Sequence, residues 1–317
     1  MQLKYFSVLR LFPQRYKLLF HFVKIFIVFS TLVRLIFVLW AFKEVDTSFF
    51  KIANTFVIGF LFDVGTVSFF AVPYALYLLI FPRKWYGSLF DKIVTWFAYT
   101  LGLIIFLFSF FAEITFWEEF KNRFNFIAVD YLIYTYEVVK NINESYPIPL
   151  LVGGILLMTA VLLFFTKRKG IFQKTFYNET NFQQKILPTI FFIAIAAIFV
   201  LFVKNKDAEQ FENRYNNEIA KTGIYSFFAA FQNNELSFTD FYKTLPVTEA
   251  FAEVKSEFKK RNDSLLFPEK ELIYRNISNT DSLAELKPNV ILICVESLSA
   301  KFLGSFGNTE GITPTLD

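Results

Sequence analysis

The chain has 317 residues, of which 55% are apolar and 21% are aromatic, including 46 phenylalanines, and its formal net charge is only +4. This composition favours a membrane protein over an ordinary soluble domain. The small positive charge is accounted for by loops between apolar stretches, so nucleic acid is not expected as a partner, and a single cysteine excludes an intrachain disulfide.

Five apolar stretches are long enough to cross a membrane, since a hydrocarbon core of about 30 Å needs roughly 20 apolar residues per helix. The first is too long for a cleavable signal peptide, and no small-residue cleavage site follows it. We therefore predict an α-helical membrane domain over residues 1–203, with five transmembrane helices at about 20–42, 55–81, 93–112, 150–165 and 186–203.

Loop charges predict the orientation of this domain, because short cytoplasmic loops retain Lys and Arg. The third loop, from Glu113 to Pro149, has six acidic residues against three basic ones, which favours the outer side. The amino-terminal tail and the second and fourth loops are rich in basic residues, namely Lys4, Arg10, Arg15, Lys17, Arg83, Lys84, Lys92, Lys167, Arg168, Lys169, Lys174 and Lys185. We expect a multi-pass protein of the bacterial cytoplasmic (inner) membrane, with its amino terminus inside and everything after Val203 extracytoplasmic.

Two charged residues, Arg34 and Asp63, fall inside predicted spans, where a charge is costly enough to be a functional candidate by default. Adjacent helices that enter from opposite sides would bring them to similar depth. One interpretation is a structural ion pair, which should survive an exchange of the two charges. The other is a site that holds a lipid headgroup.

The third loop is long for a bare connection and is rich in aromatic and charged residues. We predict an amphipathic interfacial helix from Arg123 to Leu132 and an extended segment from Asn141 to Pro149. This loop either covers the helix bundle or shapes a lipid entry path, and in the second case Arg123 and Asp130 are candidate lipid-facing residues.

Residues 204–287 are predicted to form an extracytoplasmic juxtamembrane helix and a linker. The charged stretch Lys204–Glu218 is expected to be helical, and the aromatic stretch Ile219–Tyr242 to lie against the bilayer or a catalytic domain. From Pro246 to Lys287 the sequence is polar, which is typical of a linker, with one solvated helix over Thr248–Arg261.

The last thirty residues differ from the rest of the chain. The run Val290–Val295 predicts a strand buried on both faces, as in the middle of an α/β sheet, with Cys294 as a buried apolar residue. Glu296 follows at its carboxyl end, where such sheets bind ligands. The alternative is that Glu296 and Ser297 are ordinary turn residues at the end of a strand.

The ordered set Asn289, Val290, Glu296 and Gly311–Asp317 resembles the opening of the sulfatase and alkaline-phosphatase superfamily, in which an acid after the first core strand is a metal ligand. Glu followed by Ser is most similar to the lipoteichoic-acid-synthase-like membrane branch. The resemblance implies that residues 288–317 begin an extracytoplasmic α/β sulfatase-like domain. It also implies a divalent metal held in part by Glu296, Mn²⁺ or Mg²⁺ in the first place and Zn²⁺ as the alternative.

The resemblance also implies a Thr nucleophile and an Asp-His ligand pair, all expected beyond residue 317. No catalytic residue is therefore predicted within the chain. Thr313 and Thr315 belong to the segment after the first helix, Ser297 has no positioned base, and the single histidine, His21, lies at the cytoplasmic end of the first span. We expect an amino-terminal fragment that is inactive alone, with a natural truncation as the alternative.

Three functions remain open from the sequence. The first is a membrane-anchored, metal-dependent phosphoglycerol-type transferase or phosphoester hydrolase that acts on a lipid-linked or glycan phosphoester, with membrane lipid as partner. The second is a membrane sulfatase-like hydrolase of another ester. The third is a non-catalytic membrane scaffold or regulator.

Overall fold

The computed structural model describes residues 13–133, 135–232, 244–258, 263–278 and 288–317. The chain divides into two compact units, Met1–Leu236 and Ser237–Asp317, and each is treated by itself. The first unit is helical, and it includes the residues that follow the fifth span as far as Leu236.

Five helices of the first unit are long and apolar enough to cross a membrane: α1 (Lys17–Trp40), α2 (Phe49–Ile80), α3 (Leu89–Phe120), α6 (Ile148–Arg168) and α8 (Phe182–Leu201). The prediction of five such helices is confirmed, but most of them extend beyond the predicted apolar stretches. At 32 residues each, α2 and α3 are about 48 Å long, against a hydrocarbon core of about 30 Å. Apolar composition identifies only the part of a helix that would cross the hydrocarbon core. The helical hydrogen bonds of the backbone continue beyond that part into more polar sequence.

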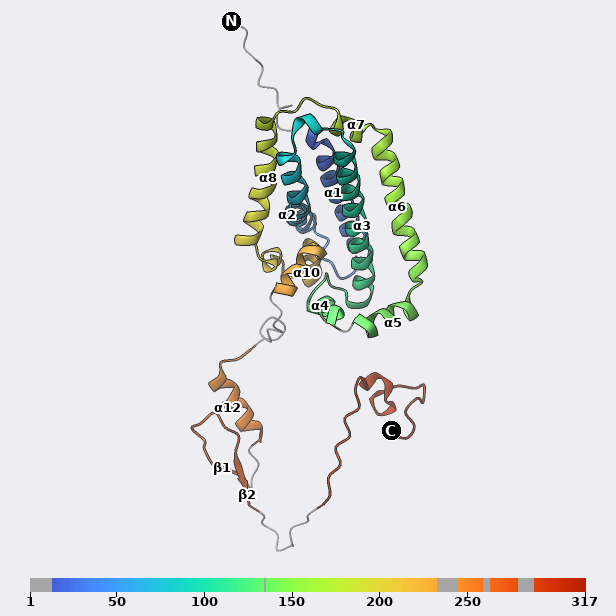
Figure 1. The fold of residues 1–317 in the computed structure, drawn as a ribbon. Helices are drawn as coiled ribbons and strands as arrows, with labels where there is room; N and C mark the ends of the chain where they lie inside the picture. The colour runs from blue at the N-terminus through green and yellow to red at the C-terminus, as the bar shows by residue number, and fades with distance from the viewer. Residues whose placement is uncertain (1–12, 134, 233–243, 259–262, 279–287) are drawn as a thin grey trace. The chain divides into compact units, whose positions relative to one another are not determined.

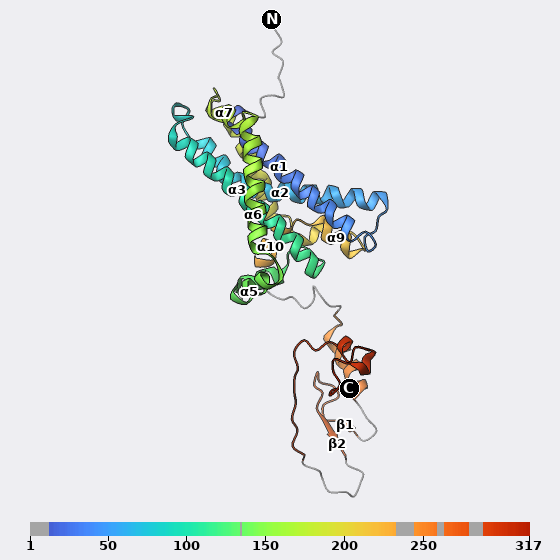
Figure 2. The same ribbon diagram turned by 90° about the vertical axis from the view of Figure 1, so that its right-hand side faces the viewer.

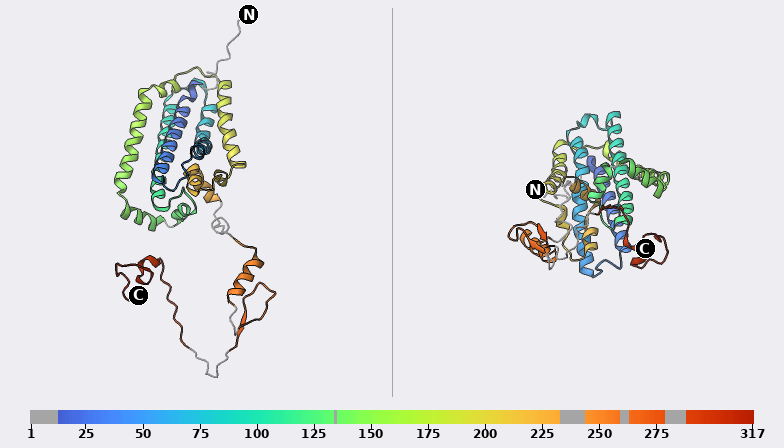
Figure 3. Two further views of the ribbon diagram at one scale, coloured as in Figure 1. Left: turned by 180° about the vertical axis from the view of Figure 1, so that it is seen from behind. Right: turned by 90° about the horizontal axis from the view of Figure 1, so that it is seen from below.

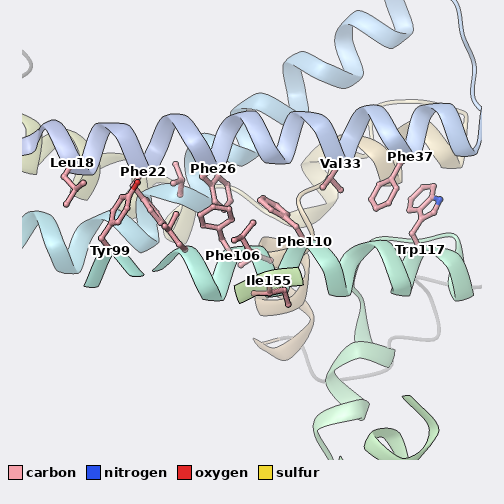
Figure 4. Close-up of a cluster of buried hydrophobic side chains, with 14 of the residues drawn as sticks. Leu18, Phe22, Phe26, Val33, Phe37, Tyr99, Phe106, Phe110, Trp117 and Ile155 are labelled. Carbon is pink, nitrogen blue, oxygen red and sulfur yellow. The ribbon is translucent and has the colours of Figure 1, made fainter. Parts of the chain in front are cut away.

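The five helices are packed in the order α8, α2, α1, α3 and α6, with α1 central (Figure 1). The core between α1 and α3 is built largely from aromatic side chains (Figure 4). Phe26 contacts Phe106 and Phe110 with ring centroids 5.9 and 5.3 Å apart. At the far end of the same interface Phe37 stacks on Trp117 at 4.3 Å. Because ring pairs of this kind add to the energy of burial, they fix how α1 and α3 align.

One end of the bundle carries the start of α1 with η2 (Gln14–Tyr16), the α2–α3 turn with η3 (Arg83–Trp85), and α7 (Ile171–Phe176). There, Phe172 of α7 stacks on Trp96 of α3 with ring centroids 3.9 Å apart. The short helix α7 therefore ties the α6–α8 connection to the bundle.

The opposite end carries five short elements: α4 (Phe126–Ile133), α5 (Thr135–Ser145), η4 (Asn205–Ala208), α9 (Arg214–Ala220) and α10 (Gly223–Gln232). Figure 2 shows α9 and α10 against the ends of the long helices. The interfacial helix predicted at Arg123–Leu132 corresponds to α4, shifted toward the carboxyl end. The extended segment predicted at Asn141–Pro149 is wrong, because α5 continues to Ser145 and α6 begins at Ile148.

The single helix predicted over Lys204–Glu218 is also wrong, since that stretch forms η4 and most of α9 with a break between them. Local hydrogen bonds account for the break. The Lys204 N–H donates to Asp207 Oδ2 at 2.7 Å, and the Asn213 side chain caps α9 by accepting from the Asn216 N–H at 3.1 Å. Short polar side chains that bond to nearby backbone favour caps and turns over a continuous helix.

The second unit contains α12 (Val247–Phe258) and an antiparallel hairpin of β1 (Asp263–Leu265) and β2 (Arg275–Ile277), with Ser264 opposite Asn276. The helix matches the one predicted at Thr248–Arg261 as far as Phe258, and residues 259–262 lie outside the described part. The hairpin was not predicted, because its strands of three residues are too short to carry an alternating pattern.

The predicted strand over Val290–Val295 is not present in the structure: these residues have no regular structure and their apolar side chains are largely exposed, from 58% at Val295 to 85% at Leu292. A strand buried on both faces needs partner strands and two covering layers. The described residues contain neither, and their only sheet is the two-stranded hairpin, so an α/β domain is not seen. The helix expected after Glu296 is represented by two 3₁₀ turns, η5 (Ala300–Phe302) and η6 (Gly304–Phe306).

Candidate functional site

Glu296 lies at the turn where the exposed apolar run ends. The next residue, Ser297, has a φ of 59°, in the left-handed region that residues other than glycine seldom adopt. Its hydroxyl lies 3.4 Å from Glu296 Oε1 as a hydrogen-bond donor. A non-glycine residue in the left-handed region is more frequent at functional sites than elsewhere. Here it turns the chain directly after Glu296.

The Asp317 carboxylate binds two residues earlier in the same segment, Ser305 and Thr313. Its Oδ1 accepts from the Ser305 N–H at 3.0 Å and the Ser305 hydroxyl at 3.2 Å, and its Oδ2 accepts from the Thr313 hydroxyl at 2.7 Å. The Ser305 N–H donor, followed by the Thr313 hydroxyl, lowers the pKa of Asp317 to about 2. We call these hydrogen bonds from Ser305 and Thr313 to the Asp317 carboxylate the clamp. A Cβ on Gly304 would lie 2.9 Å from Asp317 Oδ2, so a glycine at this position leaves room for the clamp.

Glu296 is exposed, and the described residues contain no group of three or more His, Cys, Asp or Glu side chains that is arranged to hold a metal ion. A divalent cation bound by protein needs several oxygen or nitrogen ligands. Glu296 supplies one, so the residues present do not form a complete metal site. Cys294 is exposed as well, which corrects its prediction as a buried residue.

Arg34 and Asp63 form a fully buried ion pair between α1 and α2. The Arg34 guanidinium donates to Asp63 Oδ2 at 2.8 Å and to Oδ1 at 3.1 Å, and the two side chains are 1% and 0% exposed. Oδ1 also accepts from the hydroxyls of Ser30 and Thr222, both at 2.6 Å. This pairing agrees with the structural interpretation of the two charges.

The same pair holds the chain that follows the fifth span. Arg34 Nε donates to the Ile219 carbonyl at 3.0 Å, and the guanidinium also donates to the Lys221 carbonyl at 3.5 Å. Ile219, in the last turn of α9, is fully buried, and Thr222, between α9 and α10, donates to Asp63. Residues 219–222 thus close this end of the bundle, and they are held there by hydrogen bonds to Arg34 of α1 and Asp63 of α2.

A second buried ion pair lies beside the first, between Glu113 of α3 and Arg123 in the loop after it. The Arg123 guanidinium lies 4.7 Å from the centre of the Phe37 ring, and it also donates to the Ile219 carbonyl at 3.5 Å. Burial lowers the pKa of Arg123, but a guanidinium stays protonated across the physiological range. Because Arg34 donates to the same carbonyl, Ile219 links the two ion pairs.

Lys221 extends this cluster toward the surface. Its ammonium group donates to Glu218 at 2.6 Å and to Glu209 at 2.7 Å. Burial by itself lowers the pKa of Lys221, but the two carboxylates outweigh that effect and raise it above its ordinary value. Glu218 also accepts from the Arg123 N–H at 3.0 Å, so the loop after α3 is bound to α9.

The four residues predicted to face lipid or substrate therefore have different surroundings. Arg34, Asp63 and Arg123 belong to one buried cluster, whereas Asp130 is half-buried on α4 and joins none of the ion pairs seen among the described residues. The cluster also includes Glu113, which was counted as a loop acid because it follows the apolar stretch. No sequence signal marks its pairing with Arg123 beyond the opposite charges.

A third buried ion pair, at the other end of the bundle, was missed by sequence reasoning. Arg15 and Asp91, both 0% exposed, are joined by bonds of 2.6 and 2.8 Å, and Asp91 also accepts from the Tyr77 hydroxyl at 2.8 Å. Arg15 was counted among the basic residues that orient the chain, and no partner was predicted for it. The pattern Ser88-x-x-Asp91 does signal a helix start, and Ser88 caps α3, but it carries no information about Arg15.

No family model, no curated protein and no solved structure matches this chain. Its function is therefore argued from its own residues.

Proposed function

We propose that the chain is the amino-terminal part of a membrane-anchored, metal-dependent enzyme of the lipoteichoic-acid-synthase-like branch of the sulfatase superfamily. It would transfer or hydrolyse a phosphoglycerol-type phosphoester at the outer face of the bacterial cytoplasmic membrane. The observation that carries this proposal is the ordered motif of an apolar run from Val290, the acid Glu296, and Gly311–Asp317.

The local geometry of the motif supports the proposal. The left-handed Ser297 sets Glu296 at a turn, and Asp317 holds Thr313 and Ser305 together through its two carboxylate oxygens. Gly311–Asp317, the second part of the motif, is thus held back against Ser305 by the Asp317 carboxylate. Glu296 would be one ligand of a divalent cation, whose role in this chemistry is to neutralise charge that develops on a phosphoryl group.

The five long apolar helices support a membrane anchor. Because their number is odd, the chain should enter the first helix and leave the fifth on opposite sides of the membrane. Basic residues of the turns lie at the end that carries the start of α1, including Arg83, Lys84 and Lys174. By the preference of Lys and Arg for cytoplasmic loops, that end faces the cytoplasm. The motif would then be extracytoplasmic, where lipid-linked phosphoesters of the outer leaflet are accessible.

The test uses the protein together with whatever the reading frame encodes beyond codon 317, reconstituted in liposomes with headgroup-labelled phosphatidylglycerol and Mn²⁺. Release or transfer of labelled phosphoglycerol is expected, and Glu296→Ala should abolish it while membrane insertion stays intact. Glu310→Ala is the matched control, because Glu310 is an exposed acid in the same segment and should be dispensable.

The outcomes separate the alternatives. Turnover of a sulfate ester in place of the phospholipid supports a sulfatase-like hydrolase. If Glu296→Ala keeps full activity, Glu296 is not a ligand. A stop codon directly after codon 317, or a continuing frame without a Thr nucleophile and an Asp-His pair, leaves a non-catalytic scaffold or regulator as the function.

A further inference from the structure

The helix α5 spans the gap between two membrane helices at the end of the bundle opposite to the start of α1. It is joined through α4 and the preceding loop to the end of α3, and it leads directly into α6 at Ile148 (Figures 1 and 3). At its far end, the Tyr146 hydroxyl donates to Glu118 of α3 at 3.4 Å. Because α3 and α6 are long and apolar enough to cross a membrane, these attachments keep α5 next to their ends, close to the membrane surface expected there.

One side of α5 is apolar and exposed. Tyr136, Val139 and Ile142 are 79%, 53% and 37% exposed, and with a rotation of 100° per residue they follow one another along one side of the helix. The exposed Glu144 lies about 140° around the helix from Val139, whereas the exposed Lys140 borders the stripe next to Tyr136 and the exposed Asn143 falls within it. An exposed apolar stripe on an otherwise polar helix is costly in water, so it needs a cover.

The protein itself does not cover this stripe within the described residues. The main neighbour of α5 is α4, and α4 in turn packs on α10 with its own small residues, Ala128 and Val129, buried. The exposed charges of α5, Lys140 and Glu144, are of opposite sign, which does not favour a nucleic acid or a strongly charged protein as the partner.

Exposed apolar side chains also occur on α6, which directly follows α5 in the chain. Leu150, Val152, Leu156 and Leu157 are 72%, 49%, 54% and 68% exposed along α6, and in a spanning helix such side chains meet lipid. Because α5 leads directly into α6 and its carboxyl end is bonded to α3, the bilayer expected around these two helices is also the nearest cover for the α5 stripe. A helix of 11 residues, about 16 Å long, with one apolar side is suited to lie in the membrane interface.

We propose that α5 is an interfacial helix, whose Tyr136–Val139–Ile142 stripe is inserted between the lipids of the leaflet at this end of the bundle, with Glu144 toward water. The apolar side of such a helix reaches about 5–10 Å into the boundary between headgroups and acyl chains. In this position α5 anchors α4, and through α4 it anchors α10. The placement does not depend on any enzymatic activity of the protein.

The experiment places one cysteine at a time in the whole chain, after Cys294, the only cysteine, is changed to Ser. Val139→Cys reports on the stripe and Glu144→Cys on the polar side, and both positions are exposed on the same helix. Leu157→Cys on α6 is the reference for contact with lipid. Each variant is labelled with an environment-sensitive fluorophore and reconstituted in phosphatidylcholine nanodiscs.

Two quenchers read the position of each label: a lipid with a spin label below its headgroup, and iodide in the water. The Val139 label should lose fluorescence to the lipid quencher as the Leu157 label does, and should be protected from iodide. The Glu144 label should show the reverse. The proposal is overturned if the two α5 labels respond alike, if the Val139 label responds to iodide, or if it responds to neither quencher, since the last result means that protein covers the stripe. Tyr136→Cys repeats the test if Val139→Cys does not fold.

Discussion

Arg34 and Asp63 are bonded to each other, and each also bonds to groups that match only its own charge: hydrogen-bond acceptors surround Arg34 and donors surround Asp63. The remaining Arg34 donors are directed at the carbonyls of Ile219 and Lys221, and Asp63 accepts from the hydroxyls of Ser30 and Thr222. An exchange of the two charges would place a carboxylate against carbonyl oxygens. The expectation that a structural pair survives such an exchange is therefore too simple.

The first prediction concerns this pair. Asp63→Ala leaves the Arg34 charge buried without a counterion, and should lower the free energy of unfolding by about 3–5 kcal/mol. The double variant Arg34→Met, Asp63→Leu should lose less, because neither charge of this pair remains, and the exchange Arg34→Asp, Asp63→Arg should stay as unstable as the single variant. Thermal unfolding in nanodiscs measures all three. An Asp63→Ala protein as stable as the unchanged one would contradict a buried pair.

The second prediction concerns two helical glycines. A Cβ on Gly59 would lie 2.2 Å from Arg34 Nε, whereas a Cβ on Gly154 would meet nothing within 4 Å. Gly59→Ala should therefore displace the guanidinium from Asp63 and lower the unfolding temperature markedly. Gly154→Ala should be neutral, or more stable by up to about 1 kcal/mol through helix propensity. Equal effects of the two substitutions would show that Arg34 has room to move.

The third prediction concerns Glu113 and Arg123. Because both are buried, a double-mutant cycle with Glu113→Ala and Arg123→Ala should give a coupling free energy of about 1–3 kcal/mol in thermal unfolding. The exposed pair Asp46 and Lys51, whose charged atoms are 3.4 Å apart, is the control and should give less than about 1 kcal/mol. A coupling no larger than in the control pair would mean that water reaches Glu113.

The fourth prediction is a pH dependence. Asp317 accepts its hydrogen bonds as a carboxylate, so its pKa is lowered from 3.8 to about 2 and the clamp on Ser305 should persist at pH values where a free carboxyl is already protonated. The clamp is complete above the ordinary pKa and is lost as the pH falls through about 2. With ¹⁵N-serine labelling, the Ser305 amide shift should report that midpoint and stop titrating in Asp317→Asn. A midpoint near 3.8 would mean that the bonds do not form in solution.

The sequence predicts the membrane helices well because a lipid environment demands long apolar helices and little else. It predicts their ends poorly. The third span continues from Ala112 to Phe120 as a helix, since Glu113 is buried against Arg123, which hydropathy cannot register. The strand predicted at Val290 fails for the opposite reason: its composition suits a sheet, but a strand exists only where other strands pair with it.

From the sequence alone we could predict five helices long and apolar enough to cross a membrane, basic residues concentrated in alternate loops, and an acid, Glu296, directly after an apolar run. Hydropathy, charge and spacing are properties of residues that are close together in the sequence, so they can be recognised without knowing the fold. Which charges are paired is seen only once the helices are packed together. Arg34 is bonded to Ile219 from 185 positions away, and Arg15 to Asp91 from 76. A buried charge is stabilised by the partners that packing brings to it, and their identity depends on how the helices pack.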